Sequence, residues 1–374
     1  TDCAGHRPAA AAAAAAAWQR CGGCSAHTIM EDQMASPTSG GSCHSSASLR
    51  SSWADELDAL GTFVRQVTEL SGTSQPLSEG HSPSDALFAE PSQTMILFDW
   101  DDTLFPTTDF CVRKAEADPH HLREWQKAIC SYLEQACELS DAVLIVTNSR
   151  RPWVEQCIDE YVPALRPLFD RPHRAPRVIY ARERLPERKT RRAQCLNLRP
   201  VKIRTVDLEE LTQEEADDEL MLAKYEAMRE EISAFYSLYP GQSWKNIISI
   251  GDMTYERDAV QEVAFRHVPK GPENLRLKTI VQPTEATLSE ICLRMQFGRQ
   301  LLLAYVRHDG CIDIDLNEAE DPLCAIAEAL QLPQLAELPF SRHAWGRDIL
   351  PEGTDEVEQS LAAVGQIVQE SLVR

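Results

Sequence analysis

The chain has 374 residues, of which 43% are hydrophobic and 25% charged, and its formal net charge is −21 at pH 7. A membrane-spanning helix needs ~18 consecutive apolar residues, and no segment approaches that length, so we expect none. The negative charge argues against one large nucleic-acid-binding surface. The 12 cysteines lack the regular spacing of a disulfide-rich scaffold. We therefore expect free thiols and a reducing, intracellular compartment, with the cytoplasm favoured and organelle targeting left open.

Residues 1–93 are predicted to form a low-complexity, disordered arm. They hold 15 serines and an unbroken alanine run from Ala9 to Ala17. Such a composition cannot bury enough apolar surface to form a core. Near 52–70, however, apolar residues recur at helical spacing after Ser52, a residue type that often caps helices. We predict one amphipathic helix there, which docks on the following domain or, alternatively, binds a partner protein.

Residues 94–316 are predicted to form one compact α/β domain, in which short apolar runs alternate with helical patterns. Strands are predicted at 95–98, 143–146, 178–180, 247–250 and 277–281, and helices near 121–139, 153–165 and 220–238. Apolar runs separated by helices are typical of parallel strands that are covered on both faces. We therefore predict a doubly wound, Rossmann-like parallel sheet of five strands, with its ligands at the carboxyl ends of the strands.

Residues 317–374 are predicted to form an acidic, helical tail. Apolar residues recur at helical spacing between Val357 and Leu372. We expect this helix to pack on the domain, and the alternative is that it binds a partner protein.

Polar residues follow three of the predicted strands. Asp99 and Asp101 follow the first strand, Thr147 and Asn148 the second, and Asp252 the fourth. Strand alternation directs Asp99 and Asp101 to one side, where two carboxylates repel each other unless a cation compensates them. Magnesium prefers oxygen ligands and would cancel this repulsion, with Asp252 as a third carboxylate. The hydroxyl and amide of Thr147 and Asn148 would hold a phosphoryl oxygen without adding negative charge.

These residues resemble the motifs of the haloacid dehalogenase superfamily of aspartate-dependent phosphohydrolases. The motifs match Asp99, Asp101 and Thr103 (Asp-x-Asp-x-Thr), Thr147 at the end of a strand, and Gly251, Asp252 and Glu256 (Gly-Asp followed by an acid). The resemblance covers about residues 94 to 285. The string Phe-Asp-Trp-Asp-Asp-Thr-Leu is similar to that of uncharacterised members from microbial eukaryotes.

The resemblance implies a magnesium-dependent phosphatase. Asp99 would attack phosphorus and form an aspartyl-phosphate, while Asp101 would protonate the leaving oxygen and then activate water. Magnesium would be held by Asp99, the main-chain carbonyl of Asp101 and Asp252, supported by Glu256 or Asp258. The acid at position 101 favours phosphatase chemistry over dehalogenation, because a halide leaves without a proton.

The superfamily also uses a lysine that neutralises the nucleophile and the phosphate. Lys245 is excluded, because it starts the fourth strand and at ~3.3 Å per residue lies roughly 20 Å from the site. We predict Lys224, near the beginning of the helix that leads to this strand, with Lys202 as the alternative.

A reversal of charge follows the third predicted strand, within and around a polar insertion at 183–217. Residues 166–204 carry 13 arginines and lysines, and residues 207–231 carry 11 acids. Arg184 and Arg188 would attract a phosphorylated substrate, macromolecular or small, together with Thr103 and Asn148. Alternatively, the two stretches pair with each other. Nucleic acid is disfavoured because no aromatic residues are interleaved with the arginines.

Access to the site is expected to be open. Only about 16 residues separate Leu104 from the next predicted helix, too few for a folded cap, so we expect a small cap or none.

Two other classes of function stay open at this point. The chain could be a catalytically inactive phosphate-binding or scaffold protein that keeps the fold. A signalling receiver domain also uses aspartates at strand ends, but the Gly-Asp end of the fourth strand fits it poorly.

Overall fold

The computed structural model describes residues 87–114, 117–185, 213–238, 243–268, 274–317, 319, 321–338 and 354–372. All of them belong to one compact unit of the chain. The arm with its helix near 52–70, most of the insertion at 183–217, Arg188 and Lys202 lie outside the described residues. Within the described ranges, no helix is both long enough and apolar enough to cross a membrane.

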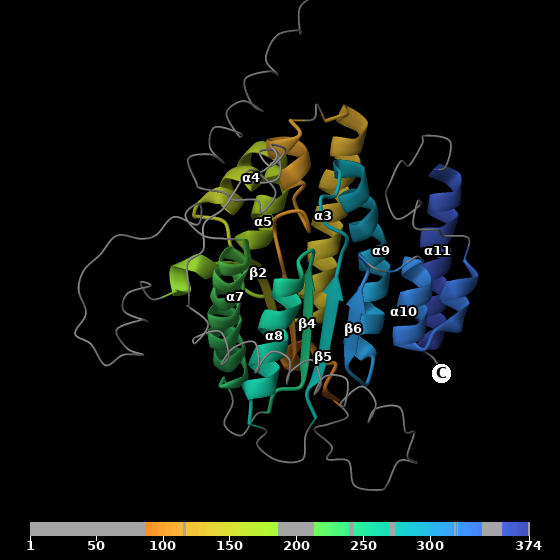
Figure 1. Cartoon of the computed structure of the whole chain (residues 1–374). Helices are drawn as coiled ribbons and strands as arrows, with labels where there is room; N and C mark the ends of the chain where they lie inside the picture. The colour runs from red at the N-terminus through yellow and green to blue at the C-terminus, as the bar shows by residue number, and fades with distance from the viewer. Residues whose placement is uncertain are drawn as a thin grey trace, which may run out of the picture. The chain divides into compact units, whose positions relative to one another are not determined.

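One sheet of six parallel strands forms the centre of the fold (Figure 1), in the order β3-β2-β1-β4-β5-β6. The strands are β1 (Thr94–Phe98), β2 (Ala142–Thr147), β3 (Arg177–Tyr180), β4 (Asn246–Gly251), β5 (Arg276–Val281) and β6 (Ile312–Asp315). The predicted α/β class and the doubly wound, Rossmann-like parallel sheet are confirmed, because this strand order is that of the Rossmann fold.

The predicted number of five strands is wrong by one. The sixth strand, β6, lies at the edge of the sheet and reads Ile-Asp-Ile-Asp. Ile312 and Ile314 are buried while Asp313 is exposed, so β6 lacks the continuous apolar run that marks the inner strands. Alternation of this kind is what a half-exposed edge strand produces.

Helices connect the strands. They are α3 (Pro119–Leu139), α4 (Trp153–Tyr161), α5 (Arg166–Phe169), α7 (Gln213–Tyr236), α8 (Thr254–Arg266), α9 (Leu288–Arg307), α10 (Pro322–Leu330) and α11 (Thr354–Ser371). Short helical turns are η3 (Pro91–Gln93), η4 (Thr108–Val112), η5 (Pro163–Leu165), η6 (Ala181–Arg184) and η8 (Pro333–Glu337). In the described part of the segment between β1 and α3, the only helical element is η4.

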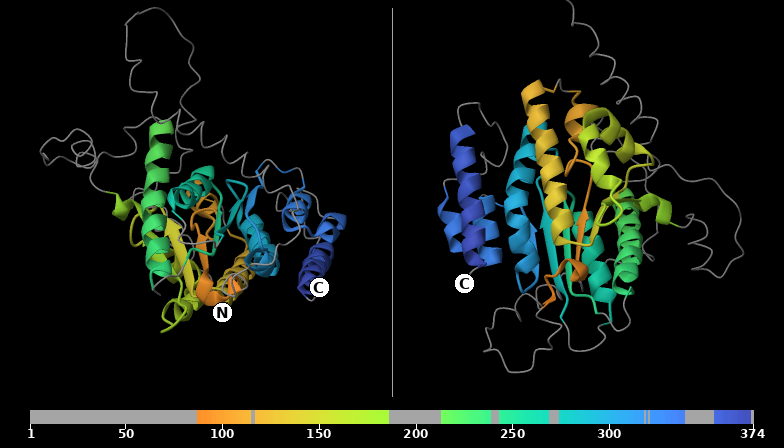
Figure 2. Two further views of the ribbon diagram at one scale, coloured as in Figure 1. Left: turned by 90° about the horizontal axis from the view of Figure 1, so that it is seen from below. Right: turned by 180° about the vertical axis from the view of Figure 1, so that it is seen from behind.

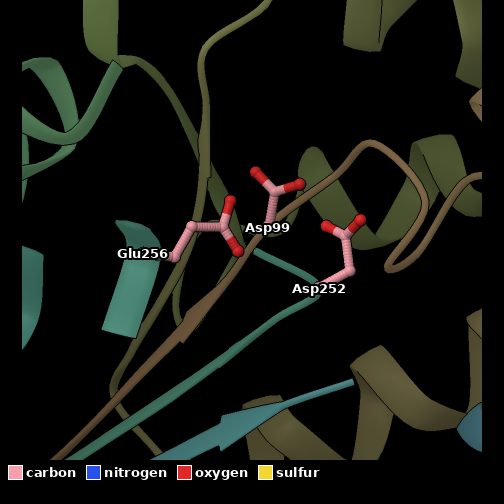
Figure 3. A group of neighbouring side chains, drawn as sticks. All are labelled: Asp99, Asp252 and Glu256. Carbon is pink, nitrogen blue, oxygen red and sulfur yellow. The ribbon is translucent and has the colours of Figure 1, made fainter. Parts of the chain in front are cut away.

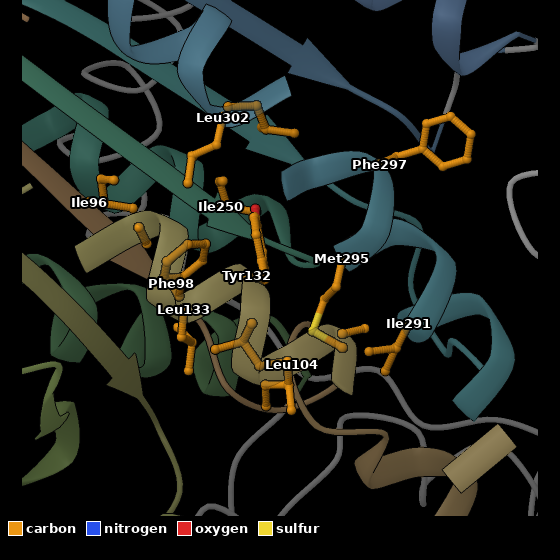
Figure 4. Packing of buried hydrophobic residues seen from close by; sticks show 14 of the residues in the cluster. Ile96, Phe98, Leu104, Tyr132, Leu133, Ile250, Ile291, Met295, Phe297 and Leu302 are labelled. Carbon is orange, nitrogen blue, oxygen red and sulfur yellow. The ribbon is translucent and has the colours of Figure 1, made fainter. Parts of the chain in front are cut away.

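Two helical layers cover the sheet, α3 and α9 on one face and α7 and α8 on the other (Figure 2). Alternation along β1 sends Ile96 and Phe98 to the core beneath α3 and α9 (Figure 4). Met95 and Leu97 enter the core beneath α7 and α8. Both faces of the inner strands are buried, which explains their continuous apolar runs.

The C-terminal helix α11 packs against α9. Val364 and Val368 belong to the apolar pattern seen in the sequence, and both are buried in the same core as α9. Because the apolar residues form one stripe and the glutamates lie on the opposite face, α11 packs on the domain through this stripe.

The winding of the chain fixes where a ligand site can form. From β1 the chain moves outward to β2 and β3, and it then returns to β4 on the other side of β1. The carboxyl ends of β1 and β4 are adjacent, since Phe98 pairs with Ile250 and the Asp99 N–H donates to the Ile250 carbonyl at 2.9 Å. Open α/β sheets bind their ligands at such a reversal point.

Candidate active site

Three buried carboxylates meet at this reversal point (Figure 3). Asp99 follows β1, Asp252 follows β4, and Glu256 lies in the first turn of α8. One oxygen of each lies within 4.8 Å of the other two. Asp99 is 7% exposed, Asp252 5% and Glu256 3%. Three carboxyl groups that lie this close together and are this deeply buried need compensating positive charge.

Lys224 supplies one positive charge to this cluster. Its Nζ contacts Asp99 Oδ1 and the Val146 carbonyl, and it donates to Glu256 Oε1 at 2.8 Å. Asp99 continues the alternation of β1 toward the α7 face, where Lys224 projects from α7. The side chain of Lys224 is 1% exposed.

The position of Lys224 within its helix differs from the expected one. It lies eleven residues after the start of α7 at Gln213, rather than near the beginning. The first turns of α7 are acidic and lack apolar periodicity. The start of the helix was therefore predicted near residue 220, later than its position at Gln213. A clearer signal was present, because Lys224 interrupts the buried stripe of Leu220, Ala223, Ala227, Met228 and Ile232.

The electrostatics of the cluster disfavour three ionised carboxylates beside a single lysine. Burial raises the pKa of Asp99 and of Asp252 well above the ordinary value, and repulsion from Glu256 adds to the shift. For Lys224, burial opposes the charged form, but attraction by Asp99 and Glu256 outweighs it and raises the pKa. The lysine therefore stays charged, while burial and mutual repulsion hold Asp99 and Asp252 back from ionising unless a further cation is present.

The cluster fits a hard divalent cation. All its donors are carboxylate oxygens, the ligands that magnesium prefers. Within the described residues, Glu256 Oε2 is buried and has no hydrogen-bond partner. A buried acceptor left in this way is costly unless a cation or donor satisfies it. Gly251 makes room for this group, since a Cβ at position 251 would lie 1.6 Å from Glu256 Oε2.

Asp101 has a different environment from Asp99. Its Oδ1 accepts hydrogen bonds from Thr107 Oγ1 at 2.7 Å and Trp153 Nε1 at 2.8 Å. Its Oδ2 accepts from Thr147 Oγ1 at 3.0 Å and Ser149 Oγ at 2.7 Å. The carboxylate does not belong to the acidic cluster, because β1 ends at Phe98 and strand alternation no longer applies.

Three of these four donors were missed from the sequence. Ser149 had a weak signal, since it continues the polar run that begins at Thr147. Trp153 had none, because tertiary folding brings the start of α4 to Asp101, and Thr107 had none, because it lies six residues after Asp101 in an irregular loop.

The other predicted polar residues lie around this centre. Thr103 Oγ1 donates to Asp252 Oδ1 at 3.3 Å. Asn148 Nδ2 donates to the Leu220 carbonyl at 3.3 Å, and its side chain also hydrogen-bonds to Tyr255. Burial, with repulsion from Glu256, raises the pKa of Tyr255 well above its ordinary value. Tyr255 was not predicted, yet it places a neutral phenol beside the acids.

Two charged residues that we expected to bind substrate or to support the metal, Arg184 and Asp258, form ion pairs with other residues. Arg184 pairs with Glu230 at 3.0 Å and with Glu231 at 3.3 Å, both on α7. This contact is the pairing of basic and acidic stretches that we gave as the alternative to substrate binding. Asp258, considered as support for the metal, pairs with Arg257 at 3.3 Å.

The loop after β1 is fixed by its own hydrogen bonds. Asp102 has a left-handed backbone conformation with φ of 53°, and its N–H donates to the Phe105 carbonyl at 2.8 Å. Its carboxylate accepts from the Thr108 N–H at 2.8 Å and contacts the Thr108 hydroxyl. Burial raises the pKa of Asp102 to about 6. The two adjacent acids thus have different partners, since Asp102 binds Thr108 whereas Asp101 binds Thr107, Thr147, Ser149 and Trp153.

Comparison of the chain with models of protein families, with curated proteins and with solved structures gives no significant match. A functional interpretation therefore depends on the residues of the site and on their resemblance to superfamily motifs.

Proposed function

We propose that this protein is a magnesium-dependent phosphatase of the haloacid dehalogenase type, acting through an aspartyl-phosphate. The observation that carries the proposal is the buried lysine, Lys224, between Asp99 and Glu256 at the reversal point of the sheet. An acid, Asp101, and a strand-end hydroxyl, Thr147, are hydrogen-bonded to each other beside it. A nucleophile, a cation and a proton donor are thus close together, as phosphoryl transfer requires.

Asp99, Asp252 and Glu256 would hold the magnesium ion, with the main-chain carbonyl of Asp101 as a further oxygen ligand. The ion would offset the charge of the phosphoryl group and of the three acids. Lys224 contacts Oδ1 of Asp99, which leaves Oδ2 as the oxygen that attacks.

In the first step, Asp99 Oδ2 forms a bond to phosphorus while the bond from phosphorus to the leaving oxygen breaks. A protonated Asp101 gives its proton to that oxygen, so an alcohol departs and Asp101 becomes a carboxylate. Lys224 balances the charge that Asp99 and the phosphoryl group share.

In the second step, Asp101 takes a proton from a water molecule as the water oxygen bonds to phosphorus. The bond between phosphorus and Asp99 breaks, and the carboxylate and inorganic phosphate are released. Thr147, Asn148 and Thr103 offer neutral hydrogen-bonding groups around the phosphoryl oxygens. The substrate class is a phosphomonoester, either a phosphoprotein or a smaller molecule.

The test is hydrolysis of p-nitrophenyl phosphate by the purified full chain, with magnesium and with a chelator. Asp99→Asn removes the nucleophile, and Asp102→Asn is the matched control. The control makes the same change in the same loop at a residue that faces Thr108, and asparagine tolerates a positive φ. Turnover that needs magnesium, is lost in D99N and persists in D102N supports the proposal.

Hydrolysis that survives in D99N would contradict this mechanism. A folded, magnesium-binding protein without turnover on aryl phosphates, phosphopeptides or sugar phosphates would instead favour the phosphate-binding scaffold.

A further inference from the structure

The four groups that hydrogen-bond to Asp101 are not equivalent. Thr107, Thr147 and Ser149 contribute hydroxyls, which can turn either to donate or to accept, whereas the indole N–H of Trp153 can only donate. Trp153 therefore favours an unprotonated oxygen at Oδ1, because the hydroxyl oxygen of a protonated carboxyl group is a weaker acceptor than its carbonyl oxygen. A proton on Asp101 is directed to Oδ2, where two hydroxyls can turn to accept it.

The indole that binds Asp101 is held in place by packing. Trp153 is 2% exposed, and its ring meets Phe105 edge to face, with centroids 5.8 Å apart and planes at 89°. Phe105 belongs to the same loop as Asp101, and its N–H donates to the Trp100 carbonyl at 2.9 Å. Aromatic pairs of this kind are specific in geometry. The donor thus packs on the Phe105 ring, and the Phe105 backbone belongs to the loop that carries the carboxylate.

We propose that Trp153 is a positioning residue that orients the Asp101 carboxyl group and keeps its exchangeable proton on Oδ2. This inference rests on the proposed phosphatase function. In the first step, the proton on Oδ2 passes to the leaving oxygen as the bond from that oxygen to phosphorus breaks, and Asp101 is left ionised. Trp153 keeps its hydrogen bond to Oδ1 throughout, so only one carboxyl oxygen carries out the transfer.

The experiment compares two aryl phosphates that differ in their need for an acid. Phenyl phosphate has a poor leaving group that needs protonation, while p-nitrophenyl phosphate has a good one that needs it much less. For each substrate, kcat/KM of the full chain with magnesium reports phosphoryl transfer to Asp99. Trp153→Phe removes the N–H and keeps an aromatic ring.

A matched control is Trp125→Phe. Trp125 also packs edge to face on Phe105, with centroids 5.9 Å apart, and its buried indole donates to the Leu104 carbonyl at 3.0 Å instead of to Asp101. The two variants lose the same kind of group from the same cluster. A purely structural effect would lower kcat/KM for both substrates alike.

We expect W153F to lower kcat/KM for phenyl phosphate about ten-fold more than for p-nitrophenyl phosphate, because general-acid catalysis is worth roughly 100-fold or more. We expect W125F to keep the wild-type ratio. If W153F does not fold, benzothienylalanine at position 153 keeps the shape of tryptophan without the N–H, and the same shift is expected.

An unchanged ratio in W153F or in the benzothienylalanine variant, with an active wild type, would overturn the role of Trp153 alone. The same shift in W125F would overturn it as well. A wild-type chain that hydrolyses neither these two substrates nor phosphopeptides and sugar phosphates would overturn the proposed function, and this inference with it.

Discussion

The carboxylate of Glu256 rests on the backbone of Gly251, where a Cβ would come within 1.6 Å of Oε2. Gly251→Ala must therefore displace Glu256 and break its 2.8 Å contact with Lys224. Changes to groups that orient metal ligands typically cost 10–100-fold in affinity or activity. We expect magnesium affinity and kcat/KM each to fall at least about ten-fold, measured by metal titration and phosphate release.

A glycine in α11 provides the control for this substitution. A Cβ at Gly365 would meet Gln300 Oε1 at 2.8 Å, and the end of a flexible side chain can move away. We expect Gly365→Ala to keep wild-type hydrolysis. A G251A protein with wild-type magnesium affinity would show that Glu256 has no part in metal binding.

Lys224→Met leaves two buried carboxylates without their cation. Removing one partner of a buried ion pair costs ~3–5 kcal/mol, so we expect a loss of this order in the free energy of unfolding, measured with urea. We expect kcat to fall at least about 100-fold, without rescue by excess magnesium. Lys245→Met is the control, since Lys245 is also buried but precedes β4 at its amino end. Equal losses of kcat in both variants would refute the assignment.

Magnesium should stabilise the protein more at pH 8 than at pH 5. In the folded state the pKa values of Asp99 and Asp252 are raised, first by burial, above the ordinary 3.8. Above pH 3.8, Asp99 and Asp252 are therefore ionised in the unfolded chain while they still hold protons in the folded chain. Without metal, the free energy of unfolding thus falls as pH rises toward the folded pKa values. Magnesium needs the ionised form and opposes this loss.

At 100 times its Kd, magnesium adds about 2.7 kcal/mol, and we expect the rise in Tm to be larger at pH 8 and absent in Asp252→Asn. Thermal unfolding with magnesium and with a chelator provides the measurement. A rise that is equal at both pH values, or that D252N retains, would argue against this site.

Lys278 should make stability increase from neutral to alkaline pH. Burial lowers its pKa from 10.5 to about 7, and its Nζ contacts Asn246 Oδ1. Between pH 7 and pH 10.5, Lys278 is protonated in the unfolded chain but mostly neutral in the folded chain. The unfolded state therefore binds more protons, and the free energy of unfolding rises with pH by at most ~1.4 kcal/mol per pH unit. Below about pH 7 both states are protonated and the contribution stays at its lowest.

The comparison with Lys278→Met isolates this effect. We expect the unfolding free energy of the wild type, relative to K278M, to rise by about 2 kcal/mol between pH 7 and pH 9. Lys127→Met changes an exposed lysine and should leave the pH dependence unchanged. Parallel pH profiles for the wild type and K278M would contradict the lowered pKa.

The inner strands could be predicted because they are buried on both faces, and so they read as apolar runs without interruption. β6 could not, because Asp313 faces solvent and the pattern alternates. The start of α7 was missed for a related reason, since its acidic first turns have no apolar face. Where a segment is only partly buried or is exposed, the spacing of its apolar residues no longer predicts its secondary structure.

The candidate site was partly visible in the sequence. Asp99 and Asp252 follow strands, so topology alone brings them to one edge of the sheet. The environment of Asp101 was not visible, because Trp153 and Thr107 reach it from a helix start and a loop. A hydrogen bond such as that of Trp153, 52 residues from Asp101, leaves no local pattern, and neither does the path of an irregular loop such as the one that holds Thr107.

The strand order also sets the time at which the site can be completed during synthesis. Asp99 leaves the ribosome before its neighbours, since Lys224 and Asp252 follow it by 125 and 153 residues. The nascent chain thus carries an incomplete set of acids until these residues are made, with β1 lacking β4 beside it. A chain released before β4 keeps Asp99 and lacks Asp252 and Glu256, so it cannot assemble the acidic cluster.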